Sequence, residues 1–317
     1  MLTNIITLVL LPIAVLISFH KGYDGLSYNE EFFCKRQTCT VKGIMILLVY
    51  IHHFSQMVDN TQLIERIYRL APISVAFFLF LSGYNTCIGH SKAAGVDYKA
   101  IWIKRCWRLY IPAVIWSFSF NWYLDALLVF WIFTDIAYAL FDTKVKRLEL
   151  IFGGNMAWVF FCKFAGLGAW WYTDVLTYSA GAAFFMYNNE IISFLKARKN
   201  YIVTLLFLIL ISIYTAYNSI NYYNYDVSMI VFSFASCLVL IMIMMKLNPT
   251  SKLFYIFGQY SWEVFLLHKT VISIMRLISQ RNSIVFISSF IISLVLGMAI
   301  NKGVNSIHMK VSNYFTR

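Results

Sequence analysis

The sequence predicts an all-α fold: a polytopic helical bundle integral to a membrane. Of its 317 residues, 60% are hydrophobic and only 13% are charged, whereas soluble domains carry about 25% charged residues. The apolar residues gather in long runs separated by short polar segments. Because one membrane span needs about 20 residues, this length accommodates about ten core helices plus one N-terminal helix.

The net charge of +12 fits the same fold class. Basic residues are concentrated in the segments between apolar runs, as expected for cytoplasmic loops of a membrane protein. Membrane topology therefore explains the charge, and we expect no nucleic-acid partner. The charge pattern predicts a multi-pass protein of the plasma membrane, with the N-terminus outside and the C-terminus in the cytoplasm.

The apolar runs divide the chain into residues 1–41 and a membrane domain over 42–317. The first part holds a predicted helix over 2–19, which lacks the basic start and the small-residue cleavage site of a signal peptide, and a cytoplasmic loop. The predicted spans of the domain lie at 42–58, 71–88, 110–141 (two short helices), 150–168 (weak, tilted or re-entrant), 170–187, 201–217, 228–246, 253–270 and 284–301.

The run from Lys42 to Phe54 begins with a cation and ends with two histidines, His52 and His53. Ionisable residues inside a span are rare and indicate a functional site. Lys42 and His53 are separated by about 16 Å along a helix. The cation would then lie at the inner face and the imidazole deep in the outer half, although a structural role for the histidines stays open.

A second polar group occurs in the predicted span 253–270, where Glu263 precedes His268. A carboxylate and an imidazole in one buried helix could polarise each other or a third group. The alternative is a structural pair that holds helices together.

Arg105 and Arg108 follow Lys104 at the start of another apolar run. The i, i+3 spacing places the two guanidinium groups on one helix face, and such groups bind phosphates in a bidentate manner. Ordinary positive-inside anchoring would also explain basic residues here.

Ser82-Gly83, inside the span 71–88, favours close helix packing.

Together these segments resemble the acyltransferase 3 family of membrane acyltransferases. Lys42-Gly43 and His53 follow the spacing of the Arg-Gly pair and histidine in that family's first core helix, with lysine in place of arginine. Segments 77–84, 104–112 and 261–268 are similar to its Phe-Phe-x-Leu-Ser-Gly-Phe, Arg-Arg-x-x-Arg-Leu-Tyr-Pro and Ser-Tyr-x-Ile-Tyr-Leu-x-His signatures. Trp171-Tyr172 resembles the tryptophan-led start of a middle helix.

The resemblance implies transfer of an acyl group, usually acetyl from acetyl-CoA, to a hydroxyl of an extracytoplasmic polysaccharide or lipid-linked glycan of a bacterial cell envelope. His53 takes the family's catalytic position, as general base or transient acyl carrier, and His268 and Glu263 would orient it or the acceptor. The residues expected to bind acyl-CoA are Lys42, Lys104, Arg105 and Arg108, and those expected at the acceptor are Trp171 and Tyr172.

This chemistry requires no metal and no permanently bound cofactor, since acetyl-CoA acts as a substrate. The expected partners are acetyl-CoA, the glycan and membrane lipids; a homo-oligomer stays open. Capsule or exopolysaccharide is the favoured acceptor. The competing interpretation is a multi-helix transporter or flippase for a lipid-linked sugar or a small anion, which would also place histidines and arginines within its spans.

Overall fold

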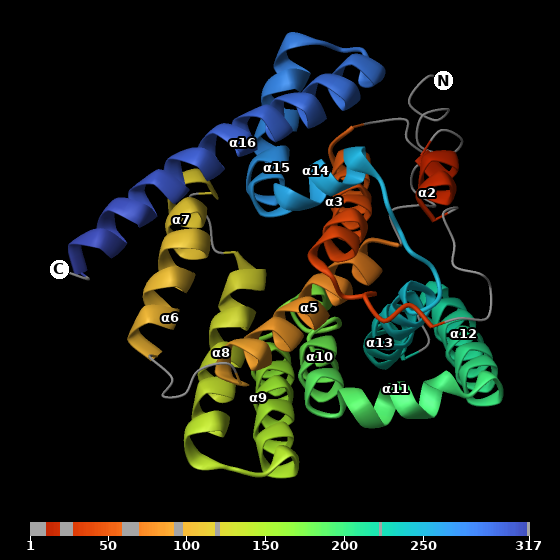
Figure 1. The fold of residues 1–317 in the computed structure, drawn as a ribbon. Coiled ribbons are helices and arrows are strands. Elements are labelled where there is room, and N and C mark those ends of the chain that lie inside the picture. The colour runs from red at the N-terminus through yellow and green to blue at the C-terminus, as the bar shows by residue number, and fades with distance from the viewer. Residues whose placement is uncertain are drawn as a thin grey trace.

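The computed structural model describes residues 11–19, 28–58, 70–91, 98–117, 121–221 and 224–315, with side chains in these ranges except at 100, 115–117 and 307–315. The predicted helix over 2–19 and the loop over 20–41 therefore lie partly outside the described residues. Within these ranges every regular element is a helix, which confirms the all-α prediction (Figure 1).

The order of elements follows the apolar runs of the sequence. They are α2 (Leu11–Phe19), α3 (Lys35–Met57), α5 (Ala71–Ser91), α6 (Tyr98–Arg105), the π-helical turn η2 (Cys106–Tyr110), α7 (Ile111–Ser117), α8 (Trp122–Leu140), α9 (Lys144–Phe164), the 3-10 turn η3 (Ala169–Trp171), α10 (Leu176–Met186), α11 (Asn188–Lys196), α12 (Arg198–Ile220), α13 (Tyr225–Met244), α14 (Lys252–Gln259), α15 (Ser261–Ile278) and α16 (Asn282–Phe315).

Six of the described helices are long and apolar enough to cross a membrane, namely α3, α5, α8, α12, α13 and α16. This supports a membrane protein but does not confirm the predicted count of about ten core spans. The helix α10 has only 11 residues, and α9 begins at Lys144 within a predicted basic loop. The orientation of the termini remains a prediction.

The single span predicted over 253–270 is wrong, because the chain breaks there into α14 and α15. Tyr260 has φ −107° and ψ 18°, outside the helical region, and separates the two helices. Ser251 caps α14 by accepting a hydrogen bond from the Phe254 backbone N–H at 3.3 Å. The apolar pattern continues across the break, so it does not reveal a change of helix direction.

The short helix α14 packs directly against the backbone of α3. A Cβ atom on Gly43 would collide with the Phe254 carbonyl, and one on Gly258 would collide with the Cys39 carbonyl. Because no other residue lacks a Cβ, the contact requires glycine on both helices. The helix α3 begins at Lys35, before the predicted boundary at residue 41. The division of the chain stays a prediction.

A second close crossing joins α5 to α10. Here a Cβ atom on Gly83 would collide with the Tyr178 carbonyl, and one on Gly181 with the Phe80 carbonyl. The Ser82-Gly83 segment therefore has the packing role that the sequence favoured.

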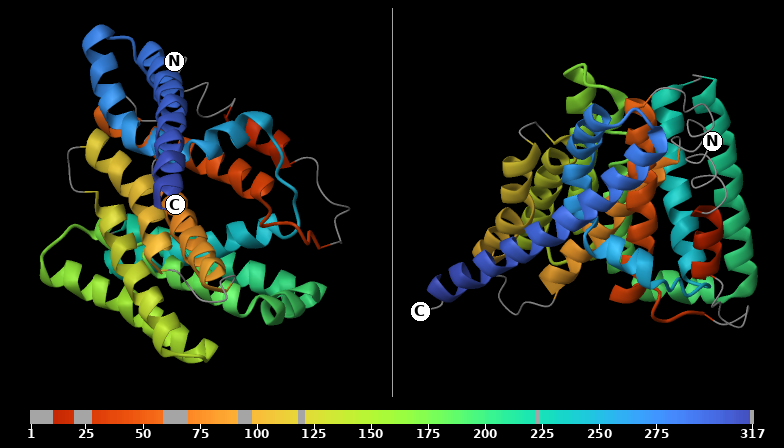
Figure 2. Two further views of the ribbon diagram at one scale, coloured as in Figure 1. Left: turned by 60° about the vertical axis from the view of Figure 1, so that its left-hand side comes forward. Right: turned by 90° about the horizontal axis from the view of Figure 1, so that it is seen from above.

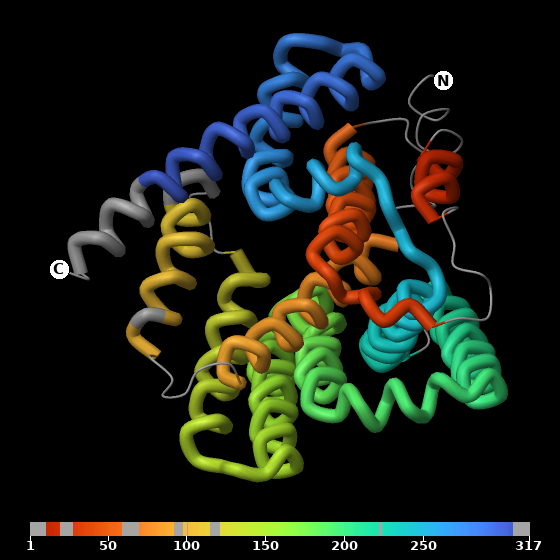
Figure 3. Tube along the Cα trace, viewed as in Figure 1, coloured from red at the N-terminus to blue at the C-terminus, as the bar shows by residue number. Residues whose placement is uncertain are grey.

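The helix α3 lies at the centre of the bundle, between α5 on one side and α14 and α15 on the other (Figures 1 and 3). The helices α8, α9 and α10 form a second apolar cluster around Phe130, Trp158 and Tyr178. α12 and α13 pair with each other, and α16 packs against α15 (Figure 2). The space bordered by α3, α5, α6, α8 and α15 positions the candidate site.

Candidate active site

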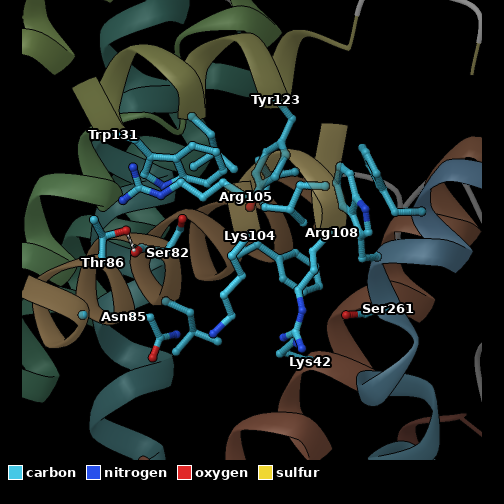
Figure 4. Close-up of a pocket in the computed structure, with 18 of the residues that line it drawn as sticks. Lys42, Ser82, Asn85, Thr86, Lys104, Arg105, Arg108, Tyr123, Trp131 and Ser261 are labelled. Carbon is cyan, nitrogen blue, oxygen red and sulfur yellow. Dashed lines mark hydrogen bonds between the residues drawn. The ribbon is translucent and has the colours of Figure 1, made fainter. Parts of the chain in front are cut away.

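A cavity of about 500 Å³ lies among α3, α5, the α6–η2 helix, α8 and α15. Its lining includes all four cations expected to bind acyl-CoA, which come from two separate parts of the chain: Lys42, Lys104, Arg105 and Arg108 (Figure 4). Ser82, Asn85 and Thr86 add polar atoms from α5. The structure thus brings the predicted cations to one cavity of the size that small-molecule sites have, about 300–1,000 Å³.

Arg105 is held in place by Asp135 of α8. The guanidinium Nη1 donates to Asp135 Oδ2 at 3.0 Å, and Nη2 to Oδ1 at 3.4 Å. Trp102 Nε1 and His90 Nε2 contact the same carboxylate, each at 2.8 Å. The Arg105 guanidinium also lies 4.8 Å from the centre of the Trp131 ring. Arg105 is therefore a fixed wall of the cavity whose charge is largely balanced by Asp135.

Arg108 lies within η2, where the helix widens into a single π-helical turn. Such turns are rare and occur frequently at functional sites. Both Arg105 and Arg108 face the cavity, as the i, i+3 spacing predicted. Because the Asp135 pair engages Arg105, the cations that remain for an anionic ligand are Lys42, Lys104 and Arg108.

His53 and His268 come together from opposite ends of the sequence. Their ring centres are 5.0 Å apart, while the neighbouring His52 ring is 4.8 Å from that of His53. His53 Nδ1 is 3.1 Å from the side-chain oxygen of Gln56. The predicted pairing of the α3 histidine with the late histidine is thus present in the folded chain.

The protonation of His268 follows from its hydrogen bond. Its Nδ1 is 3.0 Å from the Val264 carbonyl oxygen, and a carbonyl oxygen only accepts, so Nδ1 carries the proton. In neutral His268 the other nitrogen, Nε2, then has a lone pair. Nε2 is buried without a hydrogen-bond partner in the described structure, and a buried acceptor left unpaired is costly to maintain.

The histidine pair continues the two helix faces that line the cavity. On α3, Lys42 and Val49 line the cavity, and His53 follows Val49 by four residues, on the same face. On α15, Ser261 and Phe265 line the cavity, and His268 follows Phe265 by three residues. The two imidazoles therefore lie one helical turn beyond the cavity wall rather than on it.

Glu263 is directed away from His268. Its Oε1 accepts a hydrogen bond from Asn301 of α16 at 2.6 Å, and its Oε2 has no hydrogen-bond partner in the described structure. The sequence placed Glu263 near His268 because they share a helix, but the structure directs the carboxylate toward α16.

Trp171 and Tyr172 lie in the second apolar cluster and do not line the cavity. Trp158 Nε1 donates to the Trp171 carbonyl at 2.9 Å. Tyr172 is buried, with the Lys163 ammonium 5.7 Å from its ring centre. The structure does not bring these two residues to the histidine pair, and acceptor binding by them stays a prediction.

Asp135, Phe265 and Asn301 are the residues of the site that sequence reasoning missed. Asp135 had a usable signal, because a carboxylate inside the apolar run 122–140 is unusual and needs a partner. Phe265 and Asn301 carry no such signal, since an aromatic residue and an amide are common in helices.

Residues 40–121 match the acyltransferase 3 family model, which is described as an acyltransferase domain. The match contains most of α3, all of α5 and the α6–α7 helix, and therefore His53 and the four cations of the cavity. No curated protein and no solved structure matches the chain. The match confirms the family resemblance drawn from the motifs. Residues 40–121 are thus similar to the acyltransferase domain that this family model describes.

Proposed function

We propose that the protein is a membrane-bound O-acetyltransferase that moves an acetyl group from cytoplasmic acetyl-CoA to a hydroxyl of an extracytoplasmic or lipid-linked polysaccharide. The observation that carries the proposal is the continuity of the site: the two helix faces that line the cationic cavity also carry His53 and His268. A phosphate-binding region and a pair of imidazoles then lie along one path through the bundle.

The donor binds first in this scheme. Its phosphates interact with Lys42, Lys104 and Arg108, since ammonium and guanidinium groups bind phosphate through charge-assisted hydrogen bonds. Arg105 borders the same cavity as part of the Asp135 network. The thioester arm extends along α3 and α15 toward the histidines.

His53 then acts as the general base. It removes the proton of the acceptor hydroxyl, whose oxygen attacks the thioester carbonyl carbon. The carbon–sulfur bond breaks, and the thiolate takes up the proton, so that the products are the acetyl ester and free CoA. Imidazole suits this step because its ordinary pKa is close to neutral. His268 Nε2 offers a second acceptor for the proton beside it.

The same geometry also permits His53 to carry the acetyl group transiently. Attack by an imidazole nitrogen on the thioester would form an acetyl-imidazole and release CoA before the acceptor reacts. Acetyl radiolabel that stays on the protein in the absence of acceptor would distinguish this route from direct transfer.

The acceptor of the proposal is a surface polysaccharide of a bacterial plasma membrane, with capsule or exopolysaccharide favoured. Its support is the chemistry that the family resemblance implies, together with the position of the histidines near the end of α3 opposite Lys42. Trp171 and Tyr172 remain proposed contacts of the acceptor.

The test uses the purified full-length protein in proteoliposomes with radiolabelled acetyl-CoA and candidate polysaccharides. We expect acetyl transfer to polysaccharide, and its loss in His53→Ala. The control is His52→Ala, which alters the adjacent imidazole and should retain transfer. Full transfer by a folded His53→Ala protein would refute the role of His53.

A second candidate function is a transporter or flippase for a lipid-linked sugar or small anion. The observation that favours it is the break between α14 and α15, because transporters often bind substrates at interrupted helices. Movement of a lipid-linked sugar across proteoliposomes without acetyl-CoA, combined with no acetyl transfer, would support this function instead.

A further inference from the structure

Two side chains lie between the cationic cavity and the histidine pair. Val49 of α3 and Phe265 of α15 both line the cavity. The next turn of each helix carries His53 and His268, respectively. Along each helix, Val49 and Phe265 are thus the cavity-lining residues that come directly before the two imidazoles.

Phe265 is held in position by other aromatic rings. It stacks on Trp262 with ring centres 5.7 Å apart and an angle of 22°, and it lies 6.0 Å from the ring of Tyr123 on α8. On its other side its ring centre is 6.0 Å from that of His268. Rings packed from two helices do not move without disturbing their neighbours, so Phe265 forms a fixed boundary.

Val49 forms the matching boundary on α3. Its side chain is buried and belongs to the main apolar core. Because valine is branched at Cβ, its χ1 angle is restricted and it has little freedom to turn aside. The cavity is therefore bordered toward the histidines by one aromatic side chain on α15 and one branched aliphatic side chain on α3.

We infer that Phe265, together with Val49, determines the size of the acyl group that the enzyme transfers. The inference rests on the proposed function and deepens it by assigning specificity to residues that do not take part in the chemistry. A small acyl group passes between the two side chains to the histidines. A longer chain meets the Phe265 ring and keeps its thioester carbon away from the imidazoles.

The physical basis is the steric discrimination of an apolar pocket. One methylene group that fits or does not fit such a pocket changes specificity by about 10- to 200-fold. Truncation of Phe265 to alanine removes the ring and leaves room for several methylene groups, so the preference should shift toward longer donors without any change in the phosphate-binding cations.

The experiment measures kcat/KM for acetyl-CoA and butyryl-CoA in full-length wild-type protein and in Phe265→Ala, in proteoliposomes with the same acceptor. We expect the butyryl-to-acetyl ratio to rise by at least about 10-fold in Phe265→Ala, as for one pocket methylene, and by less in Phe265→Leu. The matched control is Phe160→Ala, the same substitution at an exposed phenylalanine of α9 outside the cavity, which should leave the ratio unchanged.

The outcomes separate this inference from the proposed function. Absence of acyl transfer from every donor in the wild type would overturn the proposed function. Wild-type acetyl transfer, with an unchanged ratio in a folded Phe265→Ala protein, would overturn only the inference. If Phe265→Ala does not fold, the same ratio is measured in Phe265→Leu and in Val49→Ala, each of which replaces a bordering side chain by a smaller one or one of different shape. A raised ratio in either folded variant supports the inference, and an unchanged ratio in both overturns it.

Discussion

Two buried histidines, His90 and His268, show how neighbours assign different roles to one residue type. Each has one ring nitrogen in a hydrogen bond and one nitrogen without a partner in the described structure. His90 binds the Asp135 carboxylate and stacks on Tyr138 with ring centres 4.6 Å apart. His268 binds a backbone carbonyl and lies beside His53.

The difference lies in the charge around each ring. The Asp135 carboxylate also receives Arg105 and Trp102, so His90 belongs to a network whose hydrogen bonds join α5, α6 and α8. His268 has no such carboxylate partner in the described structure, and its ring is 5.0 Å from a second imidazole, that of His53. We conclude that the first region supports the cavity, whereas the second is suited to proton transfer.

The largest effect on kcat is expected from removing the imidazole of His268. His268→Gln should lower kcat by at least about 100-fold, as is usual for loss of an acid–base group, while His90→Gln should leave kcat within a few-fold and lower the melting temperature. Steady-state kinetics and thermal unfolding in detergent measure both. Equal losses of kcat in the two variants would contradict the comparison.

Breaking the supporting network should have the next largest effect. Asp135→Asn leaves Arg105 without its counter-ion, and loss of one partner from a mostly buried pair costs about 3 kcal/mol. We expect a lower melting temperature and a higher KM for the acyl-CoA donor. Asp142→Asn, a change at an exposed aspartate, is the control. An unchanged melting temperature in Asp135→Asn would show that the network does not support the cavity.

A smaller effect is expected at the close contact between α14 and α3. Gly43→Ala places a Cβ against the Phe254 carbonyl, and overpacking of this kind costs about 1–3 kcal/mol. Gly89→Ala, where an added Cβ has no neighbour within 4 Å, should be neutral or slightly stabilising. Similar melting temperatures for the two variants would be inconsistent with the observed helix contact.

The smallest effect is expected from the ion pair between Lys144 and Glu190. The two side chains are 52% and 58% exposed, with Nζ and Oε1 3.2 Å apart, and exposed pairs contribute little because solvent screens them. Lys144→Ala should leave the melting temperature unchanged within error. A marked decrease would mean that exposed charges contribute as much as the Asp135 network.

Sequence patterns alone determined the helical class, the membrane character, the two histidine positions and the four cations of the cavity. These features depend on local chemistry. An apolar run of sufficient length forms a helix whose backbone groups are satisfied internally, and an ionisable residue inside it remains visible against an apolar background. The match over residues 40–121 supports the family resemblance that these motifs indicated.

Only the tertiary structure decided which faces meet. The orientation of Glu263 toward Asn301, the Asp135 network and the contact of Phe265 with Tyr123 all depend on contacts between different helices. The break at Tyr260 likewise became visible only in the folded chain. Helical periodicity is a property of one segment and does not specify its neighbour. Where two helices touch is set by matching surfaces, here by glycines that admit a facing backbone at Gly43 and Gly258.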